Sequence, residues 1–497
     1  MKHLLILIIT NSLVFGELQF PSNFKFGVAT SAYQVEGAWN LSGKGENIWD
    51  YAVHRTPNVI QDGTNGDIAC DTYHHTEGDV QLLKQLGVNF YRISLSWSRI
   101  LPTGFKNKIN PDGIRYYNEL LDALTANGIE PMVSLFHWDL PQPLQDLGGW
   151  TNPLMADYFL EYVRIAYENF GDRVKYWITF NEPSVLCAGS YEGGLLALAP
   201  FLKSRGVGLY LCGHTLLIAH AKAYHLYDKE FRKSQKGKIG ISLQGIWYEP
   251  SSSSKENVQA ANQRLQMEFG WFAHPIFSKK GDYPPIMKER ISFMSKQENF
   301  AQSRLPEFTP AEISYIRGTS DYFGFNHYTS AYAVPANISG GPSQDSDFGS
   351  SLSQDPLWEA GASWWIRSVP WGFGNILKWI KNEYGNPEVI ITENGFSDKG
   401  GLQDCRRINY HYKYLEALLN AIHNEGCNIS GYTAWSFMDN FEWTGGYSKK
   451  FGLIRVDFES PERTRTLKMS AYAYRNIIET KKIDWSFTPS GFEKCVF

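Results

Sequence analysis

The strongest constraint on the fold is a regular alternation of apolar, strand-like segments with amphipathic, helix-like ones. Eight short segments rich in β-branched and aromatic residues are expected to be strands, and they span residues 24–34, 89–97, 130–138, 174–182, 238–247, 321–329, 388–394 and 429–440. Between them, apolar residues recur at three- and four-residue spacing, which predicts helices, for example at 79–86, 113–126, 154–170, 211–231, 371–384 and 408–424. Eight strands alternating with helices predict an α/β fold, a single (β/α)8 TIM barrel.

The length of the chain predicts a barrel with enlarged loops. Its 497 residues exceed the roughly 250 that such a barrel typically needs, and no linker or shift in composition divides them. We therefore expect one barrel domain over residues 17–497 with enlarged βα loops. The segment 337–355, rich in Ser, Gly and Asp, is the clearest such loop, and 251–255 is a smaller one.

The first sixteen residues have the pattern of a secretory signal peptide. A basic start at Met1-Lys2-His3 precedes the apolar run 4–9, and small or compact residues follow near Gly16. The run is short and soon interrupted by polar residues, so an uncleaved anchor is disfavoured. No later apolar run reaches the roughly 20 residues of a spanning helix. We expect a secreted, extracellular protein without a membrane anchor.

Charge and cysteine content narrow the expected partners. The net charge of −4 and the pI near 6.3 give no electrostatic basis for binding nucleic acid or an anionic membrane. Six cysteines allow up to three disulfides whose pairing the sequence leaves open. No metal-binding spacing such as C-x-x-C occurs, and we expect neither a metal nor a cofactor. Asn40, Asn337 and Asn428 open glycosylation sequons; Asn337 is favoured because it lies in the polar loop, and Asn428 is disfavoured because it opens a predicted buried strand.

Two of the predicted strands end in the same way. The run 389–392 stops at Glu393-Asn394-Gly395, and the run 177–180 ends at Asn181-Glu182-Pro183. The carboxyl ends of barrel strands form the face that binds ligands. The alternative for Glu393 alone is that it merely ends the strand and caps the next segment. Two together predict a facing pair of carboxyl groups, and such a pair catalyses the hydrolysis of glycosides.

Other predicted strand ends also carry polar or aromatic side chains. A single buried His137 or Trp435 is more often a core residue than a ligand contact. With the two glutamate ends included, seven such ends on one face are harder to explain by packing, and their donors and acceptors match a ring of hydroxyl groups. The side chains concerned are Gln34, Arg92, His137, Asn181, Asn326, Tyr328, Trp435, Glu442 and Trp443.

Five motifs make the chain resemble glycoside hydrolase family 1 over about residues 19–480. The motifs are T-F-N-E-P at 179–183, I-T-E-N-G at 391–395, W-S-F-M-D-N-F-E-W at 435–443, F-G-V-A-T-S-A-Y-Q at 26–34 and Y-R-I-S-L-S-W-S-R at 91–99. Within the family the chain looks most like secreted arthropod β-glucosidases, with a myrosinase-like member as an alternative. The resemblance implies a retaining β-glycosidase that acts on small β-glucosides or oligosaccharides.

The resemblance also implies roles for the two glutamates. Glu393 matches the nucleophile, and Arg92 and Tyr328 would stabilise its charge. Glu182 matches the general acid/base, so burial and the nearby negative charge should raise its pKa. Retention requires carboxyl groups about 5–5.5 Å apart. Asn181 should hydrogen-bond the sugar 2-hydroxyl.

Further positions match the sugar pocket of the family. Glu442 implies an unphosphorylated sugar, because a carboxylate repels phosphate; glucose is expected first, with galactose and fucose as alternatives. Trp365 matches the aromatic wall on the leaving-group side, with Trp364 as the neighbouring alternative. The remaining matches are Gln34, His137 and Trp443 for sugar hydroxyls, Asn326 and Tyr328 beside the carboxyl groups, and Trp435 as the platform under the ring.

The chain departs from the family pattern at 184–193 and 195–205, which should line the leaving-group entrance. Three cations near that entrance, Lys203, Arg205 and Arg367, would suit an anionic leaving group, although surface cations are usually just solvated. A thioglucosidase (myrosinase) acting on glucosinolates is therefore the rival to an O-glucosidase. A catalytically inactive sugar-binding relative is disfavoured because Glu182 and Glu393 are both present.

Overall fold

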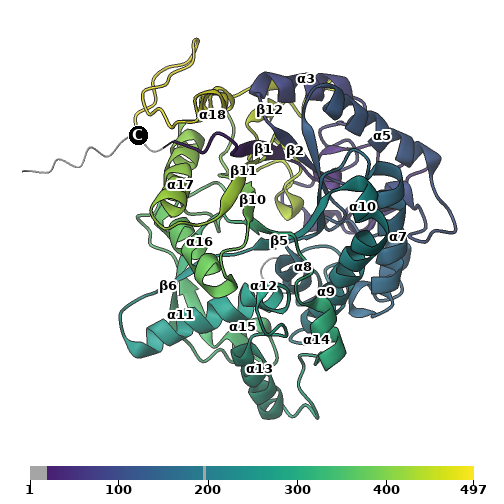
Figure 1. Ribbon diagram of the computed structural model, residues 1–497, viewed down its shortest axis with the longest axis vertical. Helices are drawn as coiled ribbons and strands as arrows, with labels where there is room; N and C mark the ends of the chain where they lie inside the picture. Colours follow the sequence, from purple (N-terminus) through teal and green to yellow (C-terminus); the bar gives the residue numbers. More distant parts are fainter. Residues whose placement is uncertain (1–18, 194–196) are drawn as a thin grey trace, which may run out of the picture.

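The computed structural model describes residues 19–193 and 197–497, so the predicted signal peptide lies outside the described residues. Eight parallel strands close into a barrel in the order β1-β11-β10-β7-β5-β4-β3-β2 (Figure 1), which confirms the predicted TIM barrel. The strands are β1 (Lys25–Ala29), β2 (Phe90–Ser94), β3 (Glu130–Ser134), β4 (Tyr176–Asn181), β5 (Lys238–Gln244), β7 (Tyr322–Asn326), β10 (Val389–Asn394) and β11 (Ile429–Trp435).

The six predicted helices are present, and they pack around the barrel (Figure 1). In α7, Phe159, Tyr162, Val163 and Ala166 recur at three- and four-residue spacing and are all buried, so one stripe of the helix faces the core. These helices are α3 (Thr76–Leu86), α5 (Pro111–Ala126), α7 (Met155–Phe170), α9 (Gly208–Leu226), α16 (Pro370–Tyr384) and α17 (Cys405–His423), and a π-helical turn at Tyr227–Phe231 continues α9.

Six strands end at least three residues earlier at their carboxyl ends than the sequence predicts. The fifth and sixth end at Gln244 and Asn326 rather than at 247 and 329, and the other four are as follows. The first strand ends at Ala29, and Gln34 lies in the short helix α1 (Ala32–Val35). The second, third and eighth strands end at Ser94, Ser134 and Trp435 rather than at 97, 138 and 440. The residues beyond these ends leave the ladder but stay buried or half-buried in the rim of the barrel. Buried residues therefore continue past the point where strand pairing stops, so the hydropathy pattern predicts strands that are too long.

The enlarged loops contain regular structure that the sequence did not predict. Strands β6 (Trp247–Pro250), β8 (Ser330–Pro335) and β9 (Ser350–Ser353) form a small separate sheet, and β12 (Ile454–Val456) pairs with β13 (Arg465–Leu467). The segment 337–355, predicted as an irregular loop, contains α15 (Gln344–Phe348) as well as β9. The further helices are α2 (Ile48–Arg55), α4 (Trp97–Ile100), α6 (Gln142–Gln145), α8 (Pro183–Tyr191), α10 (Arg232–Gln235), α11 (Lys255–Glu268), α12 (Gly270–Phe277), α13 (Pro285–Gln297), α14 (Pro310–Ile316) and α18 (Met469–Thr480), with 3₁₀ turns at Pro57–Val59, Gly149–Thr151 and Trp443–Gly445.

Two disulfides form among the six cysteines, Cys187–Cys212 and Cys405–Cys495. Cys70 and Cys427 are buried thiols. All three sequon asparagines are exposed, so the burial expected for Asn428 is wrong: it lies just ahead of β11, outside the ladder. Across residues 19–193 and 197–497, no helix has the length and apolar character to cross a membrane.

Candidate active site

Both strand-end glutamates lie at the carboxyl-terminal face of the barrel and are almost completely buried. Glu393 occupies the end of β10, and Glu182 follows the last residue of β4. Their exposed fractions are 4% and 6%. Asn326, at the end of the intervening strand β7, pairs with Glu393 in the ladder and also contacts Glu182. The two carboxyl groups that the sequence predicts as a pair therefore lie on either side of one shared neighbour, Asn326.

The Glu393 carboxylate has a charged donor on one oxygen and a phenolic donor on the other. Arg92 Nη1 donates to Oε1 at 2.5 Å, and the Tyr328 hydroxyl donates to Oε2 at 2.6 Å. The guanidinium is itself 1% exposed and also donates to the Thr392 carbonyl at 2.9 Å and to Asn181 Oδ1 at 2.7 Å. Charge-assisted bonds of this kind stabilise the ionised carboxylate and fix both of its oxygens.

Glu182 has a different environment. Its Oε1 accepts a hydrogen bond from Asn326 Nδ2 at 2.8 Å, and among the residues that the structure describes no cation forms an ion pair with this carboxyl, unlike that of Glu393. Burial, and then the negative charge of Glu393, raise the pKa of Glu182. The two carboxyl groups thus differ: Glu393 is hydrogen-bonded by Arg92 and Tyr328, while Glu182 lies where burial favours the protonated state.

A relay of hydrogen bonds orients the amide that contacts Glu182. Ser242 Oγ donates to Thr392 Oγ1 at 2.9 Å, and Thr392 Oγ1 donates to Asn326 Oδ1 at 2.6 Å. Because the carbonyl oxygen of Asn326 is occupied, its NH₂ group must point towards Glu182. Sequence reasoning missed this support. Thr392 sits inside a recognised motif, but Ser242 is a single hydroxyl in an apolar strand and gives no signal of its own.

Asn181 and His137 form the next part of the site. Asn181 Oδ1 accepts from Arg92 and Asn326, so its Nδ2 is left to donate to His137 Nε2 at 3.0 Å. Burial, and then the charge of Arg92, hold the pKa of His137 well below its usual value, so the ring is neutral. Its Nδ1 carries the proton and has no hydrogen-bond partner among the described residues, 19–193 and 197–497. Trp138, which sequence reasoning assigned no role, donates its indole N–H to the Asn181 carbonyl at 2.9 Å.

The far side of the site comes from β11 and the loop after it. Gln34 Nε2 donates to the Glu442 carboxyl at 3.3 Å and to the Phe441 carbonyl at 2.9 Å. Burial, followed by the charge of Glu393, raises the pKa of Glu442. The rings of Trp435 and Trp443 each lie 5.9 Å from the His137 ring in near-parallel orientation.

Only some of the residues expected on the leaving-group side lie next to the site. Trp365 is half-buried and packs edge-on against Tyr328 at 5.5 Å, whereas Trp364 is 58% exposed. This geometry favours Trp365 as the wall. Lys203 and Arg205 are exposed, and the Arg367 side chain donates to the Ile366 carbonyl at 3.2 Å. No contact found in the described part of the chain joins these three cations, so the expected cationic cluster is not supported.

The arrangement supplies one carboxyl group paired with a guanidinium, one buried carboxyl group with a raised pKa, a set of neutral donors and acceptors, and flat indole rings. That combination suits acid-assisted substitution at a carbon bearing two oxygens, with a polyhydroxylated ring as substrate. Within residues 19–193 and 197–497, no cluster of three or more His, Cys, Asp or Glu side chains is placed to hold a metal ion.

Comparisons with known proteins agree with this geometry. The family model for Glycosyl hydrolase family 1 matches residues 17–483. Myrosinase 1 of Brevicoryne brassicae is 49% identical over 94% of this chain and all of its own length, and the cytosolic beta-glucosidase of Homo sapiens is 42% identical over 94% and 99%. The solved structure of aphid myrosinase superimposes with a TM-score of 0.89 at 48% identity, covering 93% of this chain and all of its own. The chain therefore belongs to glycosyl hydrolase family 1 and is a β-glycosidase.

Proposed function

We propose that the protein is a retaining β-glucosidase in which Glu393 is the nucleophile and Glu182 the acid/base. The observation that carries the proposal is the unequal surroundings of the two carboxyl groups. Arg92 and Tyr328 hydrogen-bond both oxygens of Glu393, whereas the Glu182 carboxyl is buried beside that negative charge, with a raised pKa. A pair of carboxyl groups whose environments favour opposite protonation states suits these two roles.

In the first step, Glu393 attacks the anomeric carbon and the bond to the leaving-group oxygen breaks. Glu182 gives its proton to that oxygen, so the aglycone leaves as a neutral alcohol. The product is a covalent glycosyl ester of Glu393. Its formation removes the negative charge that helps to raise the pKa of Glu182. The acid that has just lost its proton therefore becomes a suitable base.

In the second step, Glu182 takes a proton from a water molecule as that water attacks the anomeric carbon. The ester bond to Glu393 breaks, the sugar leaves with its β configuration retained, and both carboxyl groups return to their starting states. Asn181, fixed by Arg92 and Asn326, is positioned to hydrogen-bond the 2-hydroxyl. Gln34, His137, Glu442 and Trp443 are assigned to the other hydroxyls, with Trp435 beneath the ring.

Covalent labelling tests the nucleophile. A 2-deoxy-2-fluoro-β-glucoside with a dinitrophenyl leaving group should inactivate the enzyme with a burst of one phenolate per active site. Peptide mapping should place the sugar on Glu393. Mapping of the label to any other residue would overturn the assignment.

Leaving-group dependence tests the acid/base. Glu182→Ala should lower kcat/KM on phenyl β-glucoside by roughly 10²–10⁴-fold, while kcat/KM on the 2,4-dinitrophenyl glucoside, which needs no proton, should change little. Added azide should restore kcat on the activated substrate and yield β-glucosyl azide. Equal losses on both substrates would remove Glu182 from this role.

A thioglucosidase activity on sulfated glucosides is the second candidate. It is favoured by the likeness to Myrosinase 1 of Brevicoryne brassicae over all of that protein's length, and by the position of Arg367 two residues from Trp365. Glu182 is compatible with this activity, since a good leaving group makes acid assistance optional while the second step still needs a base. The test compares kcat/KM for a glucosinolate and a neutral aryl β-glucoside in wild type and Arg367→Ala. Absence of glucosinolate turnover would reject the activity. Turnover with unchanged discrimination in the variant would reject Arg367 as the sulfate-binding residue.

We also propose that residues 1–16 are removed on secretion and that residues 17–497 form the catalytic domain. Expression in a secretory host should give an extracellular enzyme whose amino terminus lies near residue 17. The exposed sequons at Asn40, Asn337 and Asn428 are the expected glycan positions. Intact-mass measurement before and after removal of N-glycans tests both points, and retention of residues 1–16 would contradict the first.

A further inference from the structure

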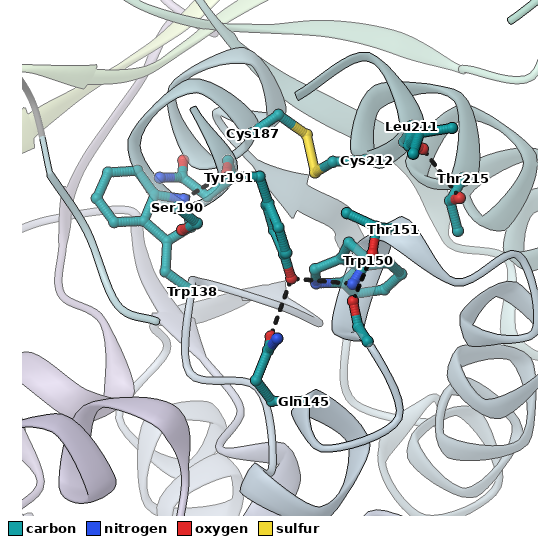
Figure 2. The surroundings of a disulfide bond; sticks show 12 residues. Trp138, Gln145, Trp150, Thr151, Cys187, Ser190, Tyr191, Leu211, Cys212 and Thr215 are labelled. Carbon is teal, nitrogen blue, oxygen red and sulfur yellow. Dashed lines mark hydrogen bonds between the residues drawn. A yellow bond between two sulfur atoms is a disulfide. The ribbon is translucent and has the colours of Figure 1, made fainter. Parts of the chain in front are cut away.

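The Cys187–Cys212 disulfide lies close behind Glu182 in the chain. Helix α8 starts at Pro183, directly after Glu182, and carries Cys187 in its second turn. The bond joins this helix to α9, and both cysteines are fully buried (Figure 2). One covalent link thus fixes the helix that immediately follows the proposed acid/base.

Glu182 has a backbone conformation that needs such support. Its φ of 46° and ψ of 59° lie in the left-handed region, which residues with a side chain rarely adopt. Such conformations persist only when the surrounding structure fixes the chain on both sides. On the incoming side, β4 is held in the barrel, and the Glu182 N–H donates to the Ser242 carbonyl at 2.8 Å. On the outgoing side, the support has to come from α8.

The carboxyl-terminal end of α8 has a separate anchor. The Tyr191 hydroxyl accepts from the Trp150 N–H at 2.9 Å and donates to Gln145 Oε1 at 3.0 Å (Figure 2). These bonds are remote from Glu182, since they fix the last residue of the helix. The disulfide is nearer, because Cys187 directly follows Leu186, whose N–H closes the first helical turn onto the Glu182 carbonyl at 3.0 Å.

We propose that the Cys187–Cys212 disulfide is a positioning crosslink that holds α8, and through it the Glu182 carboxyl, at the glycosidic oxygen. The inference rests on the proposed acid/base role of Glu182. Its consequence is selective: loss of the crosslink should impair proton transfer to the leaving group, while the Arg92–Glu393–Tyr328 set, which belongs to other strands, keeps its geometry.

The test compares two disulfide-free variants of the full-length enzyme. C187A/C212A removes the crosslink behind Glu182, and C405A/C495A removes the other one, between α17 and the carboxyl-terminal segment, as a matched control. The control closes the longer loop, with a sequence separation of 90 against 25 residues, so it should lose at least as much stability. Each variant is assayed well below its melting temperature on phenyl and 2,4-dinitrophenyl β-glucosides.

Small displacements of a catalytic group reduce rates by up to about 10²-fold. We therefore expect C187A/C212A to lower kcat/KM on the phenyl glucoside about ten- to a hundredfold, with less than a threefold change on the dinitrophenyl glucoside. C405A/C495A should leave the ratio of the two values as in wild type. Equal losses on both substrates, or the same change of ratio in the control, would overturn the proposal.

Two more variants control for misfolding of the alanine pair and for a contribution of the Tyr191 anchor. C187A/C212V retains more of the buried volume and should show the same altered ratio if the alanine pair fails to fold. Tyr191→Phe keeps the disulfide and removes only the distant anchor, so its ratio should stay within threefold of wild type. A tenfold or larger change there would show that Tyr191, not the disulfide, positions Glu182.

Glu182→Ala separates this proposal from the one on which it rests. If Glu182→Ala changes the leaving-group ratio and C187A/C212A does not, the crosslink proposal alone fails. If Glu182→Ala leaves the ratio unchanged, the acid/base assignment fails and the crosslink proposal with it. If the acid/base assignment and the crosslink proposal are both correct, removing the disulfide in the Glu182→Ala background should not change the leaving-group ratio further. The reason is that both changes act through the same carboxyl group.

Discussion

The inner and outer parts of the active site are built differently. The inner part, around Arg92, Asn181, Glu182 and Glu393, comes from the ends of barrel strands and is nearly inaccessible to solvent. Its polar atoms are joined to one another by a continuous set of hydrogen bonds. The outer part comes from long loops, and there Trp364 is 58% exposed.

This difference separates two kinds of substrate recognition. The register of parallel strands fixes where the inner side chains lie, so their geometry cannot change without disturbing the barrel. Loop residues are free of that constraint and can vary with the leaving group. Substitutions inside should therefore affect every glucoside alike, with the exception of Glu182, whose loss is felt only by leaving groups that need a proton. Substitutions outside should change the ratio between glucosides that differ in the shape of the leaving group.

The largest effect is expected for Glu393→Ala. Loss of the attacking carboxylate should lower kcat by on the order of 10⁴-fold or more, equally for alkyl, phenyl and dinitrophenyl glucosides. Steady-state assays on the three substrates check this. A loss that depended strongly on the leaving group would break the distinction between the inner and outer parts.

A smaller, equally uniform loss is expected for Glu442→Gln. Burial, followed by the charge of Glu393, raises the pKa of the Glu442 carboxyl, so its hydrogen bonds to the sugar are those of a neutral group. Loss of one such bond costs about 0.5–1.5 kcal/mol, so kcat/KM should fall about two- to tenfold on every glucoside. The glutamine keeps the shape and the neighbouring Gln34 contact. A change confined to one aglycone would place Glu442 with the outer residues instead.

The pH profile tests the inner part without mutation. Burial and the charge of Glu393 raise the pKa of Glu182, and the protonated form is the one needed for poor leaving groups. Activity on phenyl glucoside should therefore persist above the ordinary glutamate pKa of about 4.3 and fall about tenfold per pH unit beyond the raised value. The limbs of the bell belong to the Glu182–Glu393 pair. An alkaline limb at the ordinary glutamate value would contradict the proposed environment.

The smallest effect across all glucosides is expected at the rim. Trp365→Ala should lower kcat/KM for aryl glucosides about two- to tenfold, the usual contribution of an aromatic pair, and leave methyl β-glucoside nearly unchanged. Trp364→Ala is the matched control, because that neighbouring ring is largely exposed. Equal effects of the two substitutions would show that Trp365 alone does not form the aromatic wall on the leaving-group side.

The inner part could be predicted from the sequence because its residues stand at strand ends within long motifs. Asn181-Glu182 and Glu393-Asn394 each end an apolar run, and the barrel rule then places them on one face. Ser242 could not be predicted, since a lone hydroxyl in an apolar strand is revealed as a support only when β5 and β10 are placed in space. The cationic cluster predicted for the outer part is not supported by the structure. Lys203, Arg205 and Arg367 lie in loops, and the sequence does not determine which residues a loop side chain will contact.

The closure of the barrel has a consequence for biosynthesis. Strand β1 completes its pairing only with β11, near the other end of the chain, in the register Lys25 opposite Gly431. At ribosomal rates of about 5–20 residues per second, β1 waits on the order of 20–80 s after its own synthesis for this partner. One edge of the nascent sheet stays open throughout that interval, and open edges recruit foreign strands. Yield in a heterologous host should therefore depend on chaperones that shield this edge, and on translation speed over the part of the message between β1 and β11.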